Sequence, residues 1–174
     1  MQELGSAKKL SRLFRLARER VNVFAVDETG IRVGKLEAFL FVAYEPFEER
    51  ILGLYLAWTP NSIAVGMFLK DLTRKYGKHP VWTDGADWYS LACKSMNLRH
   101  HIYHHGSWLW EITERAVQKV KDRTESFDDT FPCKCYGVRC RFVHIRNWLN
   151  NFFLHNQLEY QEFIGEIKQV MSLS

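Results

Sequence analysis

Three acidic residues occupy positions at which a folded sheet could gather them around a metal ion. Asp27 ends an apolar run at residues 21–26, and Asp84 ends a second one at residues 81–83. Glu114 lies on a polar stripe of a segment with helical spacing. Carboxylates at strand ends point toward the sheet edge where ligands bind, and hard cations such as Mg²⁺ take several oxygen ligands. These residues therefore predict a phosphoryl-transfer site in which two metal ions flank one phosphate.

Each strand-end aspartate has an alternative explanation. An unpaired charge is costly to bury, so a metal is the better account of Asp27 within its apolar run. Asp84 precedes Gly85, and an Asp-Gly pair is equally common as a turn or a helix cap. Glu28 could replace Asp27 as a ligand, but successive side chains of a strand point to opposite faces. We therefore expect Asp27 to face the site and Glu28 to face away from it.

The third acidic ligand stays open on periodicity alone. One face of the expected helix is polar and another is apolar. The polar face carries Glu111, Glu114, Gln118 and Lys121. Because residues three apart are neighbours on a helix, Glu111 and Glu114 both qualify as the metal ligand.

The composition is that of one folded domain. The chain has 174 residues, of which 47% are apolar and 14% aromatic, enough for a sizeable core. It contains no apolar run of the roughly 20 residues needed to span a bilayer, and its first residues lack the apolar segment of a secretion signal. We expect a soluble protein of the cytoplasm.

The net charge of +4 is concentrated in the first 20 residues, which hold six Lys or Arg and two Glu. Apolar residues at helical spacing interleave with these cations. This pattern is typical of an amphipathic helix on a nucleic acid or an anionic membrane, or of a solvated helix packed on its own domain. A second basic run follows Glu114 and is either a DNA phosphate contact or a solvated face. The candidate DNA contacts are Lys8, Lys9, Arg12, Arg15, Arg115, Lys119, Lys121 and Arg123.

The order of the apolar patterns predicts an α/β fold. Three strands joined by short turns, at residues 21–28, 36–44 and 51–58, indicate an antiparallel meander. A helix that starts after Pro60 and ends at Gly77 follows, then a strand, a helix, another strand and further helices. This is the order of a ribonuclease H-like fold. We expect a five-stranded mixed sheet, three strands antiparallel and then two parallel, flanked by helices and extended by C-terminal helices.

Several short motifs carry a resemblance to a known family. In chain order they are Val26-Asp27-Glu28-Thr29, Leu52-Gly53-Leu54, Trp58-Thr59-Pro60-Asn61-Ser62, Thr83-Asp84-Gly85 with Trp88-Tyr89, Glu114-Arg115, Lys121-Asp122-Arg123-Thr124 and Phe131-Pro132. Their order and spacing resemble the catalytic domain of insertion-sequence DDE transposases, from about residue 8 to residue 157. The Glu114-Arg115 pair, seven residues before Lys121, favours Glu114 over Glu111 as the third ligand.

The resemblance implies a function and a set of partners. A domain of this family would hold two Mg²⁺ or Mn²⁺ ions on Asp27, Asp84 and Glu114, and would cleave and transfer DNA strands in transposition and recombination. It would act on transposon ends and target DNA at the nucleoid, as a homo-oligomer and away from membranes. The expected organisation is a basic arm at residues 1–20, an integrase-like catalytic domain at 21–157 and a helical extension at 158–174.

Two rival functions share these residues. Transposases of this family carry a helix-turn-helix region before the catalytic domain, and only the basic arm stands in its place here. The chain would then be a truncated, catalytically silent remnant that only binds DNA or other transposase subunits. A nuclease of RNA–DNA hybrids would use the same three carboxylates but would not need the basic arm. The unchanged carboxylates favour the active transposase over the silent remnant.

A cluster near the C-terminal part suggests a second metal site. Cys133, Cys135, Cys140 and His144 lie within twelve residues and are ligand types that hold Zn²⁺ tetrahedrally. The first spacing is shorter than the usual two intervening residues. Reduced cysteines without a metal are therefore the alternative.

The segment before Glu114 is rich in rings. Trp108 and Trp110 are candidates for base stacking or for core packing, and their turn differs from the polar, Arg- and Asn-containing turn of the family. Four histidines surround Tyr103 in a short expected strand. We expect them to be mainly structural, with one or two able to face the metal site. They are His100, His101, His104 and His105.

Overall fold

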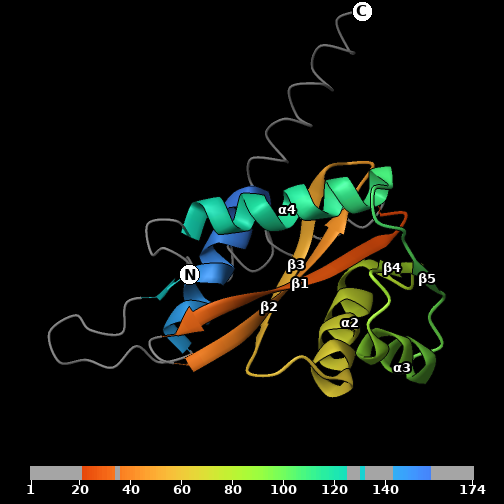
Figure 1. Cartoon of the computed structure of the whole chain (residues 1–174), viewed down its shortest axis with the longest axis horizontal. Helices are drawn as coiled ribbons and strands as arrows, with labels where there is room; N and C mark the ends of the chain where they lie inside the picture. Colours follow the sequence, from red (N-terminus) through yellow and green to blue (C-terminus); the bar gives the residue numbers. More distant parts are fainter. Residues whose placement is uncertain (1–20, 34–35, 125–129, 132–142, 158–174) are drawn as a thin grey trace, which may run out of the picture.

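The computed structural model describes residues 21–33, 36–124, 130–131 and 143–157, which form a mixed sheet with helices on both faces (Figure 1). A last helix covers residues 143–157. In chain order the other elements are β1 (Phe24–Val33), β2 (Leu36–Glu45), β3 (Arg50–Ala57), α2 (Ser62–Tyr76), β4 (Val81–Thr83), α3 (Asp87–Ser95), β5 (His100–Ile102), α4 (Trp108–Thr124) and β6 (Thr130–Phe131).

The sheet has the expected topology, with the strand order β3-β2-β1-β4-β5. The strands β1, β2 and β3 form an antiparallel meander, β4 runs parallel to β1, and β5 runs parallel to β4. The prediction of an α/β, ribonuclease H-like arrangement is confirmed. The short β6, which pairs in parallel with the end of β1, is an addition that the sequence pattern does not indicate.

The central strand β1 separates two apolar cores because its side chains alternate. Phe24 and Val26 belong to a core with α2 and α3. Ala25 belongs to a second core with α4 and the helix at residues 143–157. Figure 1 shows α4 on one side of the sheet and α2 with α3 on the other. By the same alternation Asp27 falls on the face that α4 covers.

One edge of β1 is open in its middle. The register joins only the first two residues of β1 to β4, and β6 joins only its last two. Between these pairings, that edge of β1 has no partner strand among the described residues. Asp27 lies in this gap. Ligands of α/β proteins bind where neighbouring parallel strands part in this way.

The helix α2 begins and ends at its sequence signals. The side chain of Asn61 accepts a hydrogen bond from the amide of Ala64 at 2.9 Å, as an N-cap does. Gly77 follows the helix with a φ of 95°, and its amide donates to the carbonyl of Thr73 at 2.9 Å. The predicted start after Pro60 and end at Gly77 are confirmed.

A buried glutamate holds the turn between β2 and β3. Glu45 has no exposed surface, and its Oε1 accepts hydrogen bonds from the backbone and side-chain nitrogens of Asn22 at 3.1 and 3.2 Å. Its Oε2 accepts from the amides of Phe47 and Glu48 at 2.7 and 2.9 Å. Four donors offset the cost of burying a carboxylate. One side chain therefore connects this turn to the residues that precede β1.

Part of the expected organisation lies outside the described residues, namely the basic arm at 1–20 and the extension at 158–174. The helix at 143–157 agrees with the expected C-terminal helical part. Its side chains Ile145, Leu149 and Phe153 are buried against the sheet. In the portion that the structure describes, no helix is both long and apolar enough to traverse a bilayer.

We expect Glu45→Ala to lower the free energy of unfolding by about 3 kcal/mol, because it leaves two turn amides and Asn22 without their acceptor. Denaturant unfolding followed by circular dichroism measures this change. Glu49→Ala is the matched control, since Glu49 is an exposed glutamate of the same turn, and its effect should stay within about 0.5 kcal/mol. Equal small losses in both variants would contradict the role of Glu45.

Candidate active site

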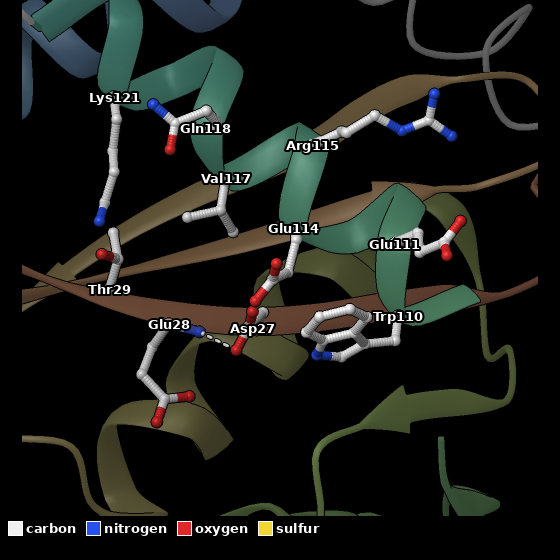
Figure 2. A pocket seen from close by; sticks show the side chains of 10 residues that line it. All are labelled: Asp27, Glu28, Thr29, Trp110, Glu111, Glu114, Arg115, Val117, Gln118 and Lys121. Carbon is white, nitrogen blue, oxygen red and sulfur yellow. Dashed lines mark hydrogen bonds between the residues drawn. The ribbon is translucent and has the colours of Figure 1, made fainter. Parts of the chain in front are cut away.

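Asp27 lies at the open edge of β1 with its side chain half-buried. Its Oδ1 accepts a hydrogen bond from the backbone amide of Glu28 at 2.9 Å. The side chain of Glu28 points away from α4 (Figure 2), and its Oε2 accepts a hydrogen bond from the hydroxyl of Tyr89 on α3. The pleat of β1 thus gives these adjacent carboxylates different surroundings, as the alternation predicts.

Glu114 reaches toward Asp27 from α4. Figure 2 shows the two carboxylates pointing at each other, one from the helix and one from the strand. They line the same cavity, which has a volume of about 1230 Å³ including its open mouth. Glu111 also lines this cavity, but its carboxylate is turned away from Asp27 (Figure 2). Residues three apart differ by about 60° around a helix, which separates the two glutamates that periodicity leaves equivalent.

Asp84 follows β4 in a tight turn. Its Oδ1 accepts a hydrogen bond from the amide of Ala86 at 3.1 Å, and Gly85 has a φ of 96°, which favours glycine. The side chain of Asp84 is exposed and is not among the residues that line the cavity of Asp27 and Glu114. Asp84 therefore stabilises a turn, as its Asp-Gly pair allows. It does not line the cavity that Asp27 and Glu114 share.

The acidic groups act on one another electrostatically. Burial is the main cause that raises the pKa of Asp27 to about 7, against the hydrogen bond from the Glu28 amide, which lowers it. The charges of Glu28, Asp84 and Glu114 raise this pKa further. Burial also raises the pKa of Glu28, and the hydrogen bond that Glu28 accepts from Tyr89 partly opposes this rise. Negative charge is therefore concentrated at the open edge of β1.

The donor set suits a hard divalent cation. Mg²⁺ and Mn²⁺ take carboxylate oxygens, and a cation beside Asp27 and Glu114 would remove their repulsion. In the described residues, no three His, Cys, Asp or Glu side chains are close enough together to hold one metal ion. Asp27 and Glu114 are the pair that already faces a common space. Asp84 lies outside their cavity, and its Oδ1 accepts a hydrogen bond from the Ala86 amide.

The basic residues of α4 lie on different sides of the helix. Lys121 is half-buried and extends toward Thr29 within the cavity of Asp27 (Figure 2). Arg115 also borders this cavity, but its side chain points away from Asp27 in Figure 2. With Lys119 it lines a smaller cavity beside Glu49 of the β2–β3 turn. Lys121 is thus the described cation best placed to meet a phosphate near the acidic pair.

Other predicted site residues fall outside the described part of the chain. They are Lys8, Lys9, Arg12, Arg15, Cys133, Cys135 and Cys140, together with the side chain of Arg123. His144, the remaining candidate zinc ligand, is exposed near the start of the helix at residues 143–157. The zinc site and the DNA contacts of the basic arm stay predictions.

Two buried tyrosines beside the acidic residues are not indicated by the sequence pattern. Tyr89, in the first turn of α3, donates a hydrogen bond from its hydroxyl to Glu28. Tyr103 follows β5, and its pKa is raised well above the ordinary value by burial and then by the charges of Asp27 and Asp84. In the sequence, only the Trp88-Tyr89 motif and the histidines around Tyr103 draw attention to these two tyrosines. Neither pattern predicts which groups the tyrosine hydroxyls contact.

The rings before Glu114 differ in their exposure. Trp108 is exposed, whereas Trp110 is half-buried, lines the cavity of Asp27 and contacts His105 edge-on with ring centroids 5.5 Å apart. Neither tryptophan is a fully buried core residue. His100 has a structural contact, because its Nε2 lies 2.8 Å from the Oγ1 of Thr83.

Sequence comparison finds one relative with limited similarity, and no protein-family model matches the chain. The uncharacterized protein MJ0017 of Methanocaldococcus jannaschii is 25% identical over 138 residues, which are 79% of this chain and 61% of that protein. The chain therefore spans less than two thirds of the length of this relative.

Solved structures of retroviral integrases are similar in fold. This chain aligns with a chain of the simian T-cell lymphotropic virus intasome, solved in complex with the PP2A regulatory subunit B56 gamma. The TM-score is 0.51 at 16% identity, over 64% of this chain and 43% of that chain. The integrase catalytic core domains of BIV and of HTLV-2, the latter in complex with magnesium, give TM-scores of 0.48 and 0.49 at 17% and 15% identity, over 61% of this chain and 70% of theirs. The strand order and the intasome alignment agree on a ribonuclease H-like fold.

Proposed function

We propose that this chain is the catalytic domain of a DDE-type transposase of the insertion-sequence class, a metal-dependent enzyme that cleaves and transfers DNA strands. The observation that carries the proposal is that Asp27 of β1 and Glu114 of α4 face each other in one cavity at the open edge of the sheet. Asp84 is the third carboxylate, and its charge acts on Asp27.

The three carboxylates would hold two Mg²⁺ or Mn²⁺ ions. When bound, such ions activate a water or a DNA 3′-hydroxyl and stabilise the leaving 3′-oxygen of an in-line displacement. Asp27, Asp84 and Glu114 act as ligands, so the protein forms no covalent intermediate. Asp27 must lose its proton to serve as a ligand, and its raised pKa brings that step near neutral pH.

The remaining cavity residues would position the DNA strand. Lys121 supplies a positive charge on one side of the acidic pair, suited to a neighbouring phosphate (Figure 2). Trp110 supplies an apolar ring on the other side (Figure 2). A strand lying across the cavity would meet the cation at one end and the ring at the other.

The proposal also covers the partners and the domain limits. The substrates are transposon ends and target DNA at the nucleoid, and holding two DNA ends requires a homo-oligomer. The catalytic domain is placed at residues 21–157, between a DNA-binding arm at 1–20 and a helical extension at 158–174. The alternative is a silent remnant that binds only DNA or other transposase subunits, and the first experiment separates the two.

We expect the chain to nick DNA in Mg²⁺ or Mn²⁺, and Asp27→Asn and Glu114→Gln each to lower the rate by at least about a hundredfold, because each removes a metal-binding charge. Nicking of a supercoiled plasmid measures this rate. Glu111→Gln is the matched control, since it removes the same charge from the same helix at a carboxylate that points away from Asp27. It should retain most of the activity.

Two results of that assay would contradict the proposal. Equal losses in Glu111→Gln and Glu114→Gln would show that the orientation of Glu114 toward Asp27 has no catalytic meaning. DNA binding by the wild type without any cleavage, in either metal, would instead support the silent remnant.

Mn²⁺ should bind about tenfold more weakly at pH 6 than at pH 8. With a pKa of about 7, Asp27 is mostly protonated at pH 6, so the metal must displace a proton there, and it is mostly ionised at pH 8. Titration calorimetry at both pH values measures the affinities. Asp27→Asn should bind weakly with a smaller pH dependence, and Glu111→Gln should keep the wild-type difference. Equal wild-type affinities at the two pH values would exclude Asp27 as the titrating ligand.

A further inference from the structure

A second cleft lies on the same face of the sheet as the acidic pair. Its floor is formed by β4 and β5, and the start of α4 forms one wall. Trp82 on this floor pairs in register with Ala25, whose side chain faces α4, so the cleft opens on the α4 side. Its volume is about 1090 Å³ including the mouth. The described residues of its lining include histidine, tyrosine and serine, but no Asp, Glu, Lys or Arg.

Aromatic rings dominate this cleft. Trp82 and His101 are register partners on β4 and β5, and their rings stack with centroids 4.7 Å apart and 21° between their planes. Phe47 and Trp108 form a second pair with centroids 5.5 Å apart. Phe47 and Trp108 are 63% and 52% exposed, which is unusual for rings of this size. The cleft therefore presents aromatic surface to solvent.

The aromatic cleft adjoins the acidic pair. Tyr103 lines the cleft, and its backbone amide donates to the carbonyl of Thr83, the residue before Asp84, at 3.0 Å. In the first turn of α4, Trp108 lines the aromatic cleft and Trp110 lines the cavity of Asp27 and Glu114. One short stretch of nucleotide chain could therefore contact both places.

We propose that the aromatic cleft takes an unstacked base of the DNA strand whose phosphate lies at Asp27 and Glu114. This inference rests on the proposed function and specifies its substrate as DNA that is single-stranded or locally unpaired beside the cleavage point. Every base has a flat π face that stacks on rings such as Trp108, and histidine nitrogens can bond to base edges. No carboxylate is among the described residues that line the cleft, so these residues do not repel the phosphates attached to the base. A base within a duplex is stacked on both sides and must leave the helix to enter.

The test compares Trp108→Ala and His101→Ala with Trp58→Ala. Trp58 is the matched control because it is also exposed but follows β3, at the opposite edge of the sheet from β5. Each protein is titrated with a short fluorescent single strand and with the matching duplex, in Ca²⁺ to prevent turnover, after circular dichroism shows that it is folded. Both cleft variants should lose about tenfold in affinity for the single strand and much less for the duplex. Trp58→Ala should lose neither.

A second readout follows the base itself. A 2-aminopurine beside the cleavage position loses fluorescence when it stacks on a ring, so the wild type should quench it and Trp108→Ala should not. Asp27→Asn should still quench it, because that variant keeps the cleft. If the wild type quenches the probe but never cleaves DNA, the proposed function fails while base binding in the cleft stands.

Three results would overturn the proposal for the aromatic cleft. Equal losses on single strand and duplex would show a contact with the DNA backbone and not with a base. A wild type that neither quenches the probe nor prefers the single strand would leave the cleft without this ligand. A wild-type dimer that becomes monomeric in Trp108→Ala, measured by light scattering, would identify the cleft as an interface between copies of the chain.

Discussion

The site depends on one constraint, which is that the central strand β1 lies between two apolar cores. The strand β1 must be apolar on both faces, because Val26 packs toward α2 and α3 and Ala25 packs toward α4. A charge fits on this strand only where its partner β4 has ended. Asp27 stands at that point, and partial burial raises its pKa to about 7 while the adjoining cavity keeps it accessible. The same gap in the sheet permits both the charge and its contact with a ligand.

The rotation of α4 then decides which residue meets Asp27. Ile112, Ala116 and Val120 bury one stripe of the helix against the sheet. With that stripe in place, Glu114 projects toward Asp27, whereas Glu111 is carried to the side (Figure 2). Apolar packing therefore sets the geometry of a polar site, because the helix cannot turn without exposing its buried stripe.

The sequence predicts the elements of this fold because their signals are local. The cap at Asn61, the glycine after α2 and the alternation along β1 each act over a few residues, and the structure agrees with all three. The contact between Tyr89 and Glu28 joins residues 61 positions apart, and the pairing of β6 with β1 is also long-range. No periodicity within one segment can report such contacts, since they depend on how the elements dock.

The candidate site was only partly accessible to the same reasoning. Periodicity finds the polar face of α4 but gives Glu111 and Glu114 equal standing, and only the docked helix distinguishes their directions. Asp84 stays ambiguous for another reason, because an Asp-Gly pair is compatible with a turn and with a metal ligand. The hydrogen bond that Asp84 accepts from the Ala86 amide supports the turn role and does not exclude the ligand role. Residue types thus predict a kind of chemistry, whereas direction and distance come from packing.

On the proposed function, the acidic pair poses a problem for a DNA strand, because phosphates are repelled by the same carboxylates that hold the metals. The flanks of the cavity offer a resolution. Lys121 offers a cation on one side, and the aromatic cleft beyond Trp110 offers neutral ring surfaces on the other. A strand could be held at both flanks before the centre is neutralised, since neither flank needs a metal. Binding would then depend on charge and stacking at the flanks, and cleavage alone would depend on the carboxylates between them.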